Sequence, residues 1–134
     1  MITIVPVGLI DYVWSEVEPL LIQAELGYEP GDRANMPEVK GRLLMGDYLL
    51  WVIASDSIVA TGIFTKKGSD FVMLTVGGER MDEWIDEVIL TAETMAKNFG
   101  CTAVTNNGGR KGWSRVLKKH GFADRPIISY KTVE

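Results

Sequence analysis

The run NGGRKGWSRVLKKHGF, residues 107–122, joins a glycine-rich basic loop to a short amphipathic helix that ends at Gly121. The residues that recur at helical spacing on one face are Trp113, Val116, Leu117 and His120. Between Cys101 and Ala123 the chain contains no acid. A loop of permissive backbone amides beside a helix start is a candidate anion or partner site, here carried by Arg110, Lys111, Trp113 and Arg115. A solvated helix with a basic outer face is the alternative interpretation.

The length and composition are those of an ordinary globular protein. The 134 residues, 46% hydrophobic and 24% charged, suit one compact domain. A net charge of −4 argues against a general nucleic-acid binder. One cysteine and one histidine exclude an internal disulfide and a Cys/His zinc site, and we expect no metal. The apolar N-terminus lacks a basic start and contains Asp11, so we expect a cytoplasmic protein without a membrane partner.

The first part of the chain predicts a strand followed by helices. Residues 2–7 alternate and are β-branched, as in a first strand. Residues 9–26 follow a helical pattern that Pro19 interrupts, which fits one bent helix or two short ones. Asn35 can cap a further helix whose buried side would be Val39, Leu43 and Leu44.

The second part predicts a meander and a crossover. Residues 48–54 form an unbroken apolar run, typical of a strand covered on both faces. Further strands are expected at residues 58–65, 71–76, 101–106 and 127–133, and the clearest helix at residues 81–99, where apolar residues keep a 3.6 period. A strand, a helix and a strand in succession imply a parallel crossover. The sequence therefore predicts a mixed α/β fold with one central sheet.

This order, with a long helix after Val76-Gly77-Gly78 and a late helix ending in His120-Gly121-Phe122, resembles the GNAT superfamily of acyl-CoA-dependent N-acyltransferases. The resemblance covers nearly the whole chain, and the run GRKGW looks like small GNAT-like proteins of phages and prophages. It implies a single GNAT-like domain at residues 1–134, with a mostly antiparallel sheet flanked by helices. It also implies transfer of an acyl group from acetyl-CoA or another acyl-CoA to an amine.

The resemblance also implies site residues. In active members the fourth strand and the next helix hold the pyrophosphate through backbone amides, and the matching cofactor-binding positions here are Val76, Gly77, Gly78 and Arg80. Glu79 follows that strand and is the candidate general base, with Glu38 and Asp47 as other carboxylates. Acids crowd this helix start at Glu79, Asp82, Glu83, Asp86 and Glu87, so a helix capped by its own carboxylates is the alternative.

Two positions depart from the family's pattern. Many active members carry a tyrosine acid four residues before the terminal Gly-Phe and an asparagine seven positions earlier, where this chain has Leu117 and Arg110. The proton for the departing thiolate would then come from water, Tyr130 or Tyr48. Two functions remain open. The first is an acyltransferase, which could be a homodimer. The second is a GNAT-like scaffold without catalysis that acts in a phage particle, in its assembly or on a host target. Binding of a phosphate ligand or nucleic acid by the basic loop ranks last.

Overall fold

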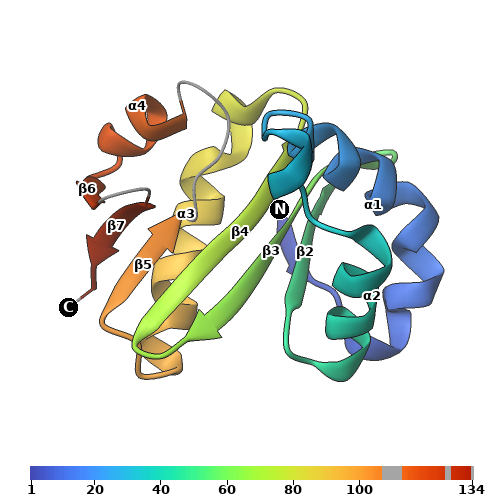
Figure 1. Ribbon diagram of the computed structural model, residues 1–134, viewed down its shortest axis with the longest axis horizontal. Coiled ribbons are helices and arrows are strands. Elements are labelled where there is room, and N and C mark those ends of the chain that lie inside the picture. The colour runs from blue at the N-terminus through green and yellow to red at the C-terminus, as the bar shows by residue number, and fades with distance from the viewer. Residues whose placement is uncertain (107–112, 126–127, 134) are drawn as a thin grey trace.

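The computed structural model describes residues 1–106, 113–125 and 128–133 (Figure 1). Its strands are β1 (Ile2–Ile4), β2 (Leu49–Ala54), β3 (Ile58–Lys67), β4 (Asp70–Gly78), β5 (Ala103–Asn106), β6 (Ala123–Arg125) and β7 (Ile128–Thr132). Its α-helices are α1 (Ile10–Glu25), α2 (Met36–Met45), α3 (Met81–Asn98) and α4 (Trp113–Lys118), with 3-10 turns at Val7–Leu9 and Pro30–Asp32. The long helix predicted at residues 81–99 is confirmed to within one residue.

The strands form one sheet in the order β1-β2-β3-β4-β5-β7-β6. All neighbouring pairs are antiparallel except β4 and β5, which are parallel. Both the predicted meander of β2, β3 and β4 and the predicted crossover through α3 are thereby confirmed. The sequence did not predict β6, because three residues are too few to show a periodicity.

Helices cover both faces of the sheet (Figure 1), α1 and α2 on one face and α3 on the other. Alternate residues of β2 therefore enter different cores: Trp51 and Ile53 join the cluster around α3, whereas Leu50 and Val52 join the cluster around α1 and α2. The first cluster is aromatic, since Trp51 lies 5.7 Å from Trp84 between ring centroids. The prediction that β2 is covered on both faces is confirmed.

The structure decides between two interpretations of α1 and corrects one expectation for α2. α1 is one helix of 16 residues that continues through Pro19, which was one of the two interpretations of its sequence. Pro19 has no N–H to donate to the carbonyl oxygen of Ser15, four residues earlier. Both residues are exposed, so water can donate a hydrogen bond to that oxygen instead. Leu44 does not lie on the buried side of α2, because its side chain is 40% exposed while Val39 and Leu43 are buried.

Candidate functional site

The fourth strand leaves its parallel neighbour halfway along its length. The β4–β5 ladder ends at the pair Met73 and Asn106, yet β4 continues to Gly78. In the β3–β4 ladder the register shifts so that Leu74 is an extra residue on β4, which is a β-bulge. A bulge bends the strand that carries it. Among the described residues, β4 after Met73 has no ladder partner on the side of β5.

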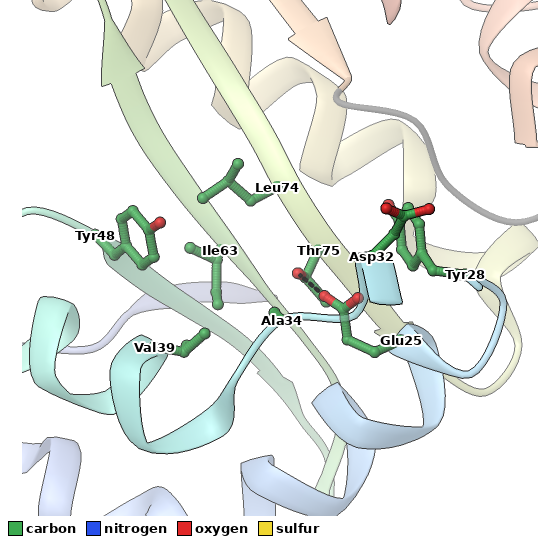
Figure 2. A pocket seen from close by; sticks show the side chains of 9 residues that line it. All are labelled: Glu25, Tyr28, Asp32, Ala34, Val39, Tyr48, Ile63, Leu74 and Thr75. Carbon is green, nitrogen blue, oxygen red and sulfur yellow. Dashed lines mark hydrogen bonds between the residues drawn. The ribbon is translucent and has the colours of Figure 1, made fainter. Parts of the chain in front are cut away.

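A pocket of about 150 Å³ lies beside this bulge, on the face covered by α1 and α2 (Figure 2). Its lining residues come from the end of α1, the α1–α2 connection, α2 and the three central strands: Glu25, Tyr28, Asp32, Ala34, Val39, Tyr48, Ile63, Leu74 and Thr75. The bulge turns the consecutive residues Leu74 and Thr75 to the same face, so both reach the pocket. Of the residues that the structure describes, two carboxylates and no lysine or arginine line it.

Glu25 is the most unusual residue of this pocket. It is the last residue of α1, and only 7% of its surface is exposed. Thr75 donates a hydrogen bond from Oγ1 to Oε1 of Glu25 over 3.1 Å (Figure 2). Burying a carboxylate costs free energy unless partners compensate for the lost water. A buried carboxylate that lines a pocket beside an open strand edge is therefore a candidate proton acceptor and a candidate ligand for a cation.

Tyr28 follows α1 and also lines the pocket. Burial raises the pKa of the Tyr28 hydroxyl above 10.0, and the nearby charge of Glu25 raises it further. The phenol is therefore protonated at neutral pH and keeps its capacity to donate a hydrogen bond.

The raised pKa of Tyr28 predicts a loss of stability in alkaline solution. Above pH 10 the unfolded chain loses this phenolic proton more readily than the folded chain, so the free energy of unfolding falls as pH rises. In Tyr28→Phe this contribution is absent, and the fall should be shallower. Urea unfolding between about pH 9 and pH 11 measures it. Equal slopes in the variant and the parent chain would contradict the assignment.

The two glycines predicted to contact a cofactor also have a packing role. A Cβ on Gly77 would lie 2.7 Å from the carbonyl oxygen of Leu20 and 3.0 Å from Cβ of Ala24, because α1 lies directly on β4 there. Gly78 has φ +138°, and a Cβ on it would lie 2.5 Å from the carbonyl oxygen of Val59. The close approach of α1 to β4 thus explains Gly77 without a ligand, and cofactor contacts of Val76, Gly77 and Gly78 remain a proposal.

Only Glu79 and Arg80 connect β4 to α3, and both side chains are exposed. The Glu79 carbonyl accepts a hydrogen bond from Nε1 of Trp84 over 2.7 Å. Arg80 has φ +55°, and its Nε lies 3.8 Å from Oε2 of Glu83. The side chain of Arg80, which precedes the first turn of α3, makes no capping hydrogen bond. The N–H of Glu79 already donates to the carbonyl oxygen of Val59 over 3.2 Å, so the connection offers the start of α3 and one exposed arginine to an anion.

The late helix differs in part from the sequence expectation. Leu117 is fully buried in the α3-side cluster, so it serves the core. Arg115 is exposed. Arg110 and Lys111, and with them the predicted basic loop, lie outside the described residues, as does the side chain of Trp113. Of the four residues proposed for the anion or partner site, Arg115 is the one whose side chain the structure describes.

The two candidate phenols lie on the same face of the sheet. Val104 of β5 belongs to the cluster around α3, so its neighbour Thr105 faces the opposite side of the sheet, where the pocket lies. Tyr130 pairs with Thr105 across the β5–β7 ladder and therefore faces the same side. Tyr48 lines the pocket itself, with the guanidinium carbon of Arg42 5.6 Å from its ring centroid.

The other carboxylates considered from sequence lie outside the pocket lining. Glu38 and Asp47 are exposed and interact with Arg42 at 3.5 Å and 3.9 Å. Four residues of the pocket lining were not predicted as site residues from the sequence: Glu25, Tyr28, Asp32 and Thr75. One signal for Glu25 was present, because it follows Leu21 by four residues on the buried side of α1.

The described residues contain no group of three or more His, Cys, Asp and Glu side chains arranged to hold a metal ion. Of the helices in the described ranges, none combines the length and the apolar character that crossing a bilayer requires.

No family model and no curated protein matches the sequence, but solved structures match almost the whole chain. An IAA acetyltransferase from Bacillus cereus has a TM-score of 0.72 at 13% identity, with 99% of each chain covered. A Bacillus subtilis acetyltransferase in complex with CoA has a TM-score of 0.71 at 12% identity, with 99% of this chain and 98% of that chain covered. A Staphylococcus aureus acetyltransferase of the GNAT family has a TM-score of 0.71 at 8% identity, with both chains fully covered. The fold is therefore that of GNAT acetyltransferases, as the sequence resemblance implied.

Proposed function

We propose that this chain transfers an acyl group from an acyl-CoA to an amine that binds in the pocket beside β4. The observation that carries the proposal is the buried carboxylate of Glu25, held by Thr75 at the bulge of the strand that separates from its neighbour. In this position a carboxylate is suited both to attract an ammonium group and to accept its proton.

The cofactor would lie along the unpaired part of β4, with its pyrophosphate at the start of α3. The uncapped first turn of α3 fits such a group through its N–H dipoles, and Arg80 offsets the nearby charges of Asp82 and Glu83. The Arg80–Glu83 pair is exposed and thus weak, so Arg80 is available to a phosphate. Bound there, acyl-CoA would supply the activated thioester. Backbone groups near Val76 would polarise its carbonyl.

The proton transfers are assigned to residues on the pocket's face. Glu25 accepts the proton of the amine, and Thr75 holds the Glu25 carboxylate in place through its hydroxyl. Glu79 is the second candidate for the base. Because Leu117 cannot donate a proton, the leaving thiolate would be protonated by water, Tyr48 or Tyr130.

Calorimetry with acetyl-CoA tests the cofactor part of this proposal. We expect saturable binding with a dissociation constant below about 1 mM, the upper end of ordinary enzyme affinities. Arg80→Ala should weaken it, because it removes the one cation of the β4–α3 connection. Absence of binding at millimolar acetyl-CoA would exclude the enzyme.

A catalytically inactive scaffold is the alternative function, and the short β4–α3 connection favours it. Two residues leave little chain to wrap a pyrophosphate, and Gly77 is occupied by packing against α1. In this case the chain would bind a protein partner, as a phage virion or assembly component or on a host target, through Arg110, Lys111, Trp113 and Arg115. Charge reversal at Arg110 and Lys111 should then weaken partner capture.

A further inference from the structure

We infer that the pocket is selective for a small primary amine with an uncharged, apolar body about the size of a benzene ring, and that it discriminates against amino acids and diamines. This inference rests on the proposed function for the fate of the amine. The selectivity itself is a property of the pocket lining and can be measured as binding.

The size of the pocket limits the ligand. A protein cavity of about 150 Å³ holds a molecule such as benzene. A peptide segment or a long polyamine would extend beyond that volume. The part of a ligand that lies inside this half-open pocket is therefore a single ring or a short aliphatic chain.

The lining divides into an acidic part and an apolar part (Figure 2). Glu25, Thr75, Tyr28 and Asp32 form the acidic part, with Glu25 buried and Asp32 exposed. The apolar part consists of Val39, Ile63, Leu74 and the ring of Tyr48. An ammonium group fits the first part, and a hydrocarbon body fits the second.

The charges of the lining determine what is rejected. Among the described lining residues, two carboxylates stand without a lysine or arginine, and their charge repels a ligand that carries its own carboxylate. Arg33, from the same connection, donates from Nε to the carbonyl oxygen of Tyr28 over 3.0 Å and does not line the pocket. A diamine would place its second ammonium group against Val39, Ile63 and Leu74, whose hydrocarbon side chains replace part of its water.

Three ligands that share the benzylamine skeleton test the inference. They are benzylamine itself, 2-phenylglycine, which adds a carboxylate, and 4-(aminomethyl)benzylamine, which adds a second ammonium group. Calorimetry is carried out on the full chain, without and with saturating CoA. We expect benzylamine to bind at least about tenfold more tightly than either of the other two compounds. This factor corresponds to the interaction with one nearby charge, reduced because the pocket is partly exposed to water. Equal affinities, or no benzylamine binding in either condition, would overturn the inference.

Two variants assign the selectivity to the acidic part. Glu25→Gln and Asp32→Asn should each weaken benzylamine binding and narrow its advantage over 2-phenylglycine, since each removes one negative charge. Glu29→Gln is the matched control, because Glu29 belongs to the same connection but not to the lining. An unchanged advantage in both pocket variants would contradict the inference. Binding of benzylamine without acyl transfer would refute the proposed function and leave the selectivity standing.

Discussion

Replacement of Glu25 by glutamine is expected to lower kcat for acyl transfer by about 100- to 10,000-fold, the usual effect of losing a general base. Glutamine keeps the shape of the side chain and an oxygen that accepts the hydrogen bond of Thr75, so the fold should persist. It has no charge and cannot take the proton of the amine. Steady-state measurement of CoA release, with circular dichroism as a check on folding, gives the result.

Glu79, the candidate base predicted from the sequence, provides a comparison for this test. Glu79 is exposed in the β4–α3 connection, and its carbonyl, not its carboxylate, has the described hydrogen bond to Trp84. If Glu25 is the base, Glu79→Gln should reduce kcat far less than Glu25→Gln. A larger loss in Glu79→Gln would transfer the role to Glu79 and leave Glu25 as a charge that only attracts the ligand.

Most of the fold was predictable from local patterns. The 3.6 period of α3 and the unbroken apolar run of β2 are strong signals, because each element buries a continuous set of side chains. Pro19 left one bent helix and two short helices as equal interpretations, because the tolerance of α1 for a proline depends on the exposure of one carbonyl, which is a property of tertiary structure. The short strand β6 gave no signal because it acquires its conformation by pairing with β7.

The site was less predictable, since its parts come from distant segments. Glu25 and Thr75 are 50 residues apart and meet only because α1 ends over β4. The bulge at Leu74 results from the pairing with β3 and has no motif of its own. Gly77 was interpreted as a phosphate contact because a glycine lets another group come close to its backbone. The sequence does not say whether that group is a ligand or, as here, a helix.

Replacement of Gly77 by alanine is expected to destabilise the fold by about 1–3 kcal/mol, the usual cost of overpacking a core. The added Cβ would meet the backbone oxygen of Leu20 at 2.7 Å, and a backbone atom within α1 cannot move alone. The displaced end of α1 carries Glu25, so acyl transfer should fall as well. Urea unfolding gives the change in stability.

Gly41→Ala is the matched control, because it adds the same methyl group with the opposite expected sign. Gly41 lies within α2, and a Cβ there would meet nothing within 4 Å, so alanine should stabilise the helix by about 0.5–1 kcal/mol. If Gly77→Ala weakened acetyl-CoA binding and left the free energy of unfolding unchanged, the phosphate would be the group that requires Gly77. A lower free energy of unfolding of Gly77→Ala, measured without cofactor, would instead show that the contact between α1 and β4 requires this glycine. The glycine would then be needed to hold Glu25 over Thr75.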